Sequence, residues 1–137
     1  MFNASRLKLA RKRRKFGSKE LAELVQVSPV TITRLEKGEN IPSQETLESL
    51  SKVLGFPEKF FMGDDVDELN ERAASFRSLA AMTAKERDAA LSSGSIAYLL
   101  SDWVSDRFNL PAPDLIEIGD NVFDPSGLAR SLREYWG

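Results

Sequence analysis

Two short helical segments separated by a tight turn constrain the fold of this chain more than any other feature of its sequence. Between Ser18 and Gly38 the apolar residues recur at helical spacing in two groups. Ser18 and Ser28 are placed to cap two helices, and Pro29 fits the first position of the second helix, where its missing N–H costs nothing. Gly38 is placed to end that helix in a left-handed conformation. The pattern predicts a pair of helices, the first over about residues 19–26, joined by a very short turn.

Further helices are expected on both sides of this pair. One is predicted from Ser5 to the basic run at residues 11–15, and another from its cap at Ser43 to Gly55, followed by a short helical turn. Helical pieces joined by so few residues pack against one another as neighbours. Residues 1–63 are therefore expected to form a compact all-α domain of five helical pieces.

The second half is predicted to be a linker followed by a helical extension. Residues 64–82 open with an acidic stretch that is poor in large apolar residues, which favours a linker. Thr83 and Glu86 have the spacing of a capping box and predict the start of a long helix that reaches about Asn109. Residues 83–137 are expected to form a helical extension for dimerisation or partner binding, so the predicted fold class is all-α throughout.

The pattern of the extension also predicts finer details. The buried face of the long helix is expected to consist of apolar residues, namely Ala89, Ile96, Leu100, Trp103 and Val104. Gly94 is expected to be a weak point of this helix. Residues 115–119 fit either a short strand or an extended loop. Asp124 and Pro125 predict the start of a last amphipathic helix, in which Trp136 fits the core or a partner surface equally well.

The composition excludes several classes of site. The chain has 137 residues, with no cysteine and no histidine, so it offers no disulfide or thiolate metal site and lacks the usual nitrogen ligand of zinc. No metal or other cofactor is expected. No apolar run approaches the roughly 20 residues of a membrane helix, so we expect a cytoplasmic protein without membrane contact. Asp102 and Asp106, four residues apart, are expected to lie on a solvated face, and no enzymatic activity is expected.

The charge of the chain is divided unevenly between its two ends. The formal net charge is −2, but residues 1–40 carry ten Lys and Arg against four Asp and Glu, whereas residues 41–137 carry nine against seventeen. The basic end, including the run at residues 11–15, is expected to face phosphate. The alternative is a solvated helix whose charges only keep it soluble. The acidic second half favours a dimer or partner surface over a second DNA contact.

The second helix of the pair carries side chains suited to reading DNA. Such reading needs one helix in the major groove and another that crosses the backbone. Arg34 can bond guanine through two donors, Thr33 can bond either kind of partner, and Val30 can touch a thymine methyl. Phosphate contacts are expected from the polar residues Lys19, Ser28 and Lys37. The whole set of expected DNA-binding residues is Lys19, Ser28, Pro29, Val30, Thr31, Thr33, Arg34 and Lys37. The alternative is a three-helix packing unit with a solvated outer face.

Three stretches of the first domain form a specific pattern: residues 18–38 read SKELAELVQVSPVTITRLEKG, residues 41–47 read IPSQETL and residues 54–57 read LGFP. This pattern closely resembles the Xre-type, lambda-repressor-like family of helix-turn-helix regulators. The resemblance implies a five-helix DNA-binding domain. In that family the residue after the first cap is often glutamine, and this chain has Lys19, which suits phosphate. Because Pro29 and Val30 replace residues that are commonly polar there, base reading is expected to depend on Thr33 and Arg34.

The second half is similar to the connecting region of Xre-type regulators that are fused to an ImmA/IrrE-type zinc metallopeptidase. The similarity rests on four stretches, residues 76–78, 82–88, 103 and 110–114. The peptidase of such fusions carries a His-Glu-x-x-His motif, which this sequence does not contain. The chain is therefore expected to be an amino-terminal portion of a longer protein or a shortened relative that has lost the enzyme.

These observations favour a sequence-specific transcriptional repressor of phage or mobile-element type that binds a double-stranded DNA operator. A homodimer is expected, with the long helix as its interface. One alternative is an antitoxin or adaptor that holds a protein partner through residues 83–137 and regulates its own synthesis. A further alternative is the DNA-binding part of a metallopeptidase regulator.

Overall fold

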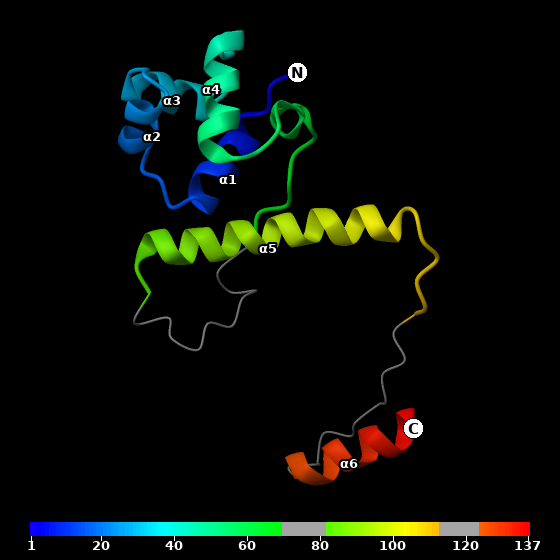
Figure 1. Cartoon of the computed structure of the whole chain (residues 1–137). Coiled ribbons are helices and arrows are strands. Elements are labelled where there is room, and N and C mark those ends of the chain that lie inside the picture. The colour runs from blue at the N-terminus through cyan, green and yellow to red at the C-terminus, as the bar shows by residue number, and fades with distance from the viewer. Residues whose placement is uncertain (70–81, 113–123) are drawn as a thin grey trace. The chain divides into compact units, whose positions relative to one another are not determined.

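The computed structural model describes residues 1–69, 82–112 and 124–137, and every regular element in these ranges is helical (Figure 1). In chain order the elements are α1 (Ala4–Arg13), α2 (Ser18–Leu24), α3 (Pro29–Glu36), α4 (Gln44–Leu54), the 3₁₀ helix η1 (Glu58–Met62), α5 (Ala84–Ser105) and α6 (Pro125–Trp136). They fall into two compact units, Met1–Asp106 and Arg107–Gly137. The predicted all-α class is confirmed, whereas the strand or loop predicted at residues 115–119 lies outside the described residues.

Most helices begin and end at the capping residues that the sequence indicates. The hydroxyls of Ser28 and Ser43 each accept the amide N–H three residues further on, at 3.1 and 3.2 Å. The Glu86 carboxylate accepts the Thr83 N–H at 2.9 Å, which completes the predicted capping box of α5. Gly38 follows α3 in the left-handed conformation that its position predicts, with φ of 71°.

The start and the end of α2 differ from the prediction. The N-cap is Gly17 rather than Ser18, which is the first helical residue. The Glu20 carboxylate accepts the Gly17 N–H at 3.2 Å, and no side chain of the N-cap residue caps the amides of the first turn. The helix ends at Leu24 because Gln26 adopts a left-handed φ of 57° and the amide after it bonds back to a carbonyl five residues earlier.

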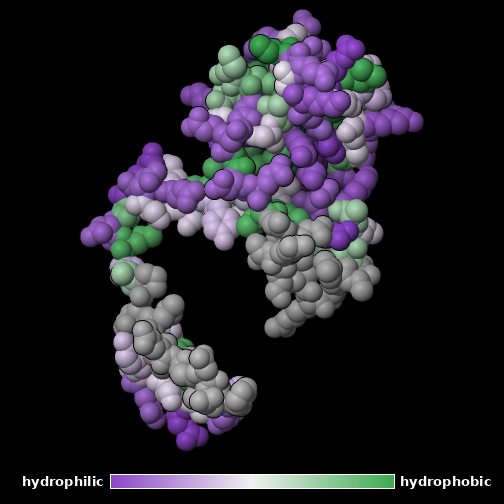
Figure 2. Space-filling view, turned by 180° about the vertical axis from the view of Figure 1, so that it is seen from behind, coloured by the Kyte–Doolittle hydropathy of each residue, from purple (hydrophilic) through white to green (hydrophobic). Residues whose placement is uncertain are grey.

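The core of the first unit joins α1, α2, α3, α4 and η1. Its buried cluster comprises Leu7, Ala10, Leu21, Ala22, Val25, Ile32, Leu35, Leu47, Leu50, Leu54 and Phe61. Around it Phe56 stacks on Phe60, with ring centroids 4.4 Å apart, and Phe60 meets Phe61 edge-on at 5.5 Å. Helices as short as these are not stable alone in water, so burial of this apolar surface holds them. Their outer faces are left to polar and charged side chains, which dominate the surface of this region in Figure 2.

α5 packs along α1 mainly through small residues, of which only Ala89 belongs to the predicted apolar face. Ala89, Ser92 and Ser95 are buried, whereas Leu100 is 62% and Trp103 48% exposed. The prediction that Leu100 and Trp103 are buried is therefore wrong. α1 has 10 residues and α5 has 22, so α1 is too short to cover the whole of α5. Small residues at the crossing let the two helices approach closely.

The chain that leaves η1 meets α5 near Gly94. The Leu69 N–H donates to the Ser95 hydroxyl at 3.1 Å. A methyl group on Gly94 would meet only the end of the Leu69 side chain, which would have to shift. Ile96 and Val104, the other members of the predicted apolar face, are half-buried.

The second unit contains α6, which begins as predicted at the Asp124 cap. The Asp124 carboxylate accepts two amide N–H groups of the first turn, at 3.1 and 2.9 Å. No described residue of α6 is buried, and Trp136 is 54% exposed. The preceding long helix ends at Ser105, earlier than the predicted Asn109, and the Pro-rich stretch follows.

Candidate nucleic-acid interface

α3 has one face fixed in the core and the opposite face open to solvent. Ile32 and Leu35 are 0% and 1% exposed, and they anchor the helix against its neighbours. Val30, on the other side, is 57% exposed. Of the residues predicted to bind DNA, one is half-buried, Thr31, and seven are exposed: Lys19, Ser28, Pro29, Val30, Thr33, Arg34 and Lys37. The fold therefore places the predicted site residues on one helix and at the start of α2.

The hydroxyl groups of this face are partly engaged by the helix itself. The Ser28 oxygen accepts the Thr31 N–H and lies 2.8 Å from the Thr31 hydroxyl. The Thr33 hydroxyl donates to the Pro29 carbonyl at 3.1 Å. In this arrangement the Thr33 hydroxyl has used its proton and can only accept a hydrogen bond, whereas the cap at Ser28 serves chiefly to set where the helix begins.

The cationic side chains of this face make no strong ion pair among the described residues. Among the residues that the structure describes, no ion pair or hydrogen bond engages the side chains of Arg34 and Lys19. Lys37 lies 3.8 Å from Glu39, with both side chains at least half exposed, and a pair of this kind is weak. Three positive charges are thus available to an anionic partner.

The basic run at residues 11–15 makes several contacts within the fold. The Arg14 guanidinium donates to the Leu54 carbonyl at 2.6 Å and lies over the Phe56 ring. Lys12 bonds Asp88 of α5 at 3.2 Å. Part of the run therefore also bonds within the fold, whereas Arg13 and Lys15 stay exposed, and contact of the run with phosphate remains a prediction.

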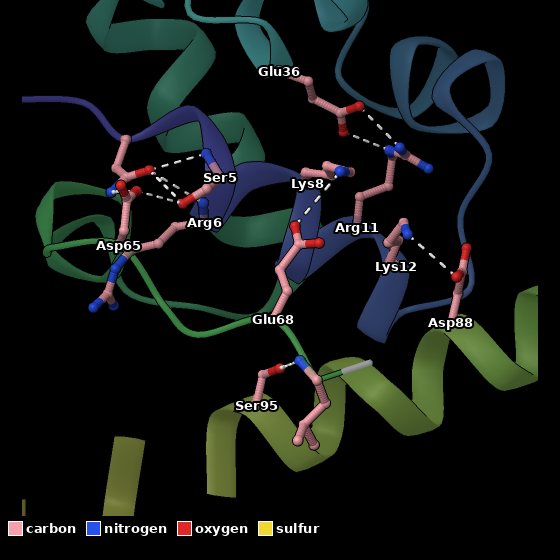
Figure 3. Close-up of polar contacts among 12 residues, drawn as sticks. Ser5, Arg6, Lys8, Arg11, Lys12, Glu36, Asp65, Glu68, Asp88 and Ser95 are labelled. Atoms are coloured by element: carbon pink, nitrogen blue, oxygen red, sulfur yellow. Dashed lines mark hydrogen bonds and ion pairs between the residues drawn. The ribbon is translucent and has the colours of Figure 1, made fainter. Parts of the chain in front are cut away.

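Arg11 makes the most extensive of these internal contacts, and it holds the end of α3. Its guanidinium bonds both oxygens of Glu36, the last residue of α3, at 2.6 and 2.9 Å, and a third N–H donates to the Phe16 carbonyl at 2.9 Å (Figure 3). The Arg11 and Glu36 side chains are only 14% and 12% exposed. Sequence reasoning missed this pair, because the two residues are 25 positions apart and only the packing of α1 on α3 brings them together.

A second set of ion pairs joins the helix-turn-helix region to α5. Besides Lys12 and Asp88, Lys15 lies 4.0 Å from Glu86 and Lys85 lies 3.3 Å from Glu20. The hydrogen bond from the Gly17 N–H, and then that from Lys85, lower the pKa of Glu20. Glu86 and Asp88 of α5 thus offset part of the positive charge of Lys12 and Lys15, an arrangement that the sequence alone does not reveal.

The described residues show no group of three or more Asp and Glu that could hold a metal ion, and the sequence has no Cys or His. No helix among them is long and apolar enough to cross a membrane.

Residues 7–61 match the helix-turn-helix family. The matched range contains α2, α3 and α4 whole and ends within η1. No curated protein and no solved structure matches the chain. The chain thus contains an Xre-like helix-turn-helix domain, and a domain of this class is the DNA-binding part of a transcription regulator.

Proposed function

We propose that this protein is a sequence-specific repressor in which residues 1–63 read an operator through α3. The outer face of α3 carries the proposal. Arg34 has no ion-pair or hydrogen-bond partner among the described residues, and it stands on a helix whose opposite face is locked in the core by Ile32 and Leu35. A helix held in this way can enter the major groove without rearranging. A protein seated there blocks access to the same DNA, so specific binding is sufficient for repression.

The exposed residues divide by the contacts that their chemistry allows. Arg34 presents a planar fork of donors that fits the two acceptors of guanine, and Val30 fits a thymine methyl. Thr33 offers an acceptor beside them. Lys19 and Lys37 are proposed to bind phosphates and to set the position of α3 along the DNA. Ser28, Pro29 and Thr31 form the first turn and bring the backbone of the helix close to the groove.

We infer further that the regulator binds DNA as a homodimer through α5. One recognition helix reads only a few base pairs, and regulators with this motif pair two half-sites about 34 Å apart. Tyr98 and Leu100, on the half of α5 that α1 does not cover, are 55% and 62% exposed. In this proposal residues 83–137 form the dimerisation part, and residues 64–82 link it to the reading domain.

The alternative is that residues 83–137 bind a different protein, as they would in an antitoxin or adaptor. The aromatic residues Tyr135 and Trp136 of α6 are each 54% exposed, which favours contact with another protein. Purification of the full chain from its host distinguishes the two proposals. A stoichiometric second protein supports the antitoxin or adaptor, and a chain that associates only with itself supports the repressor. The relation of this half to metallopeptidase fusions stays a prediction.

The proposed reading role of Arg34 is tested with the full chain and a duplex that it selects from a random library. Arg34→Ala should weaken binding to the selected duplex by about 1–3 kcal/mol and change binding to a random duplex little. The melting temperature should stay the same, because the side chain is exposed. Lys37→Ala is the matched comparison, and it should weaken both duplexes alike. Equal losses for Arg34→Ala on both duplexes would reassign it to phosphate.

A further inference from the structure

We propose that α5 is part of the DNA-binding surface and that Lys85, in its first turn, binds a backbone phosphate beside the start of α2. The inference rests on the proposed DNA-binding function and extends it beyond the helix-turn-helix domain. Lys85 belongs to the half of the chain whose net negative charge argues against a DNA contact. The total charge of that half does not indicate what a single lysine can bind.

The first step is that α5 is fixed to the reading domain within one compact unit. Lys12 bonds Asp88 at 3.2 Å, and the buried residues Ala89, Ser92 and Ser95 lie against α1. Such contacts hold the first half of α5 in one place relative to α1. A residue in its first turn therefore has a defined position near α2.

The second step is the position of Lys85 itself. Its Nζ lies 3.3 Å from the Glu20 carboxylate, which also bonds the Gly17 N–H at 3.2 Å. This chain of contacts places the Lys85 ammonium at the beginning of α2, where Lys19 is proposed to bind phosphate. Lys85 of α5 thus stands beside the start of α2, the helix that also carries the exposed Lys19.

The third step is that Lys85 is available to a phosphate. Its side chain is 61% exposed and that of Glu20 is 50% exposed, so their ion pair is weak. An ammonium has three donors, so it can bond a phosphate oxygen while it remains near the carboxylate. The neighbouring acid, Glu86, is occupied by the Thr83 N–H and lies 4.0 Å from Lys15 of α1. Part of its charge is thus offset by Lys15.

The test measures the affinity of the full chain for its selected duplex and for a random duplex over a range of salt concentrations. Lys85→Ala should weaken both by the same factor, about fivefold near 0.1 M salt, and should flatten the slope of log affinity against log salt by about 0.9. Lys85→Arg should keep both the affinity and the slope. Lys59→Ala is the matched control, because Lys59 is an exposed lysine on η1, and it should change neither quantity.

A second background separates phosphate binding from simple neutralisation of Glu20. Glu20→Gln keeps an acceptor for the Gly17 N–H but removes the charge. Lys85→Ala should still flatten the salt slope in this background. If the flattening disappears there, or if Lys85→Ala behaves like Lys59→Ala, the proposal is wrong. Binding that is sensitive to Arg34→Ala but not to Lys85→Ala would overturn this inference alone, whereas a wild-type chain that binds no duplex would overturn the proposed function.

Discussion

Arg11 and Arg34 lie on helices that pack against each other, yet their surroundings give them different roles. Arg11 is 14% exposed on its side chain and is bonded to both oxygens of Glu36, whereas Arg34 is exposed and unpaired among the described residues. The sequence indicates only that both are basic. The packing of α1 on α3 decides which arginine supports the fold and which faces outward. The spacing of residues within one helix does not reveal this packing.

The Arg11–Glu36 pair is expected to contribute to the free energy of unfolding. Arg11→Ala leaves the Glu36 carboxylate largely buried without its partner, so the free energy of unfolding should fall by roughly 2–3 kcal/mol. Chemical denaturation monitored by circular dichroism measures it. Arg13→Ala is the control, because Arg13 is an exposed arginine of the same helix, and its effect should stay within about 0.5 kcal/mol. A loss no larger than that of the control would show that the pair contributes nothing to the fold.

Helix boundaries were more predictable than helix faces. The start of α5 at Thr83 and Glu86 was predicted correctly, because a capping box is a local pattern of side chains and amides. Its buried face was predicted wrongly at Leu100 and Trp103, because an apolar stripe shows which residues favour burial but not how far the partner helix extends. The boundary at Gly17 was missed because this helix begins without a capping hydroxyl, while the Glu20 carboxylate, three residues further on, accepts the Gly17 N–H.

The capping box of α5 predicts a pH dependence of stability. The backbone N–H of Thr83, and then its hydroxyl, lower the pKa of Glu86 from its ordinary 4.5. A carboxyl whose pKa is lower in the folded chain stabilises it above the unfolded value, and this contribution is lost as the pH falls through the folded value. The wild type should therefore melt at a higher temperature than Glu86→Gln at pH 7, and the difference should shrink below about pH 4.5. A difference that is constant over this range would contradict the assignment.

The uneven charge of the whole chain is partly cancelled within the fold. Three of the basic residues in the first twenty, Lys8, Lys12 and Lys15, lie 3.5, 3.2 and 4.0 Å from carboxylates that come after residue 63. The positive charge left for DNA is therefore smaller than the sequence indicates, and it is concentrated near α2 and α3. The sequence predicted α3 and the exposure of most of its proposed DNA-binding residues, but it did not show that carboxylates of the acidic half offset part of the basic end.

The proposed dimer gives the last prediction. Leu100→Lys places a charge on the part of α5 that α1 does not cover, where it should prevent association of two copies without disturbing the core. The wild type should sediment on its selected duplex as two copies, and Leu100→Lys as one. Loss of the linked second half-site should weaken binding at least about tenfold. Met62→Lys is the control, because Met62 is an exposed apolar residue, 40% accessible, on η1. A wild-type chain that saturates the duplex as a single copy, or a Leu100→Lys variant that still pairs, would exclude α5 as the interface.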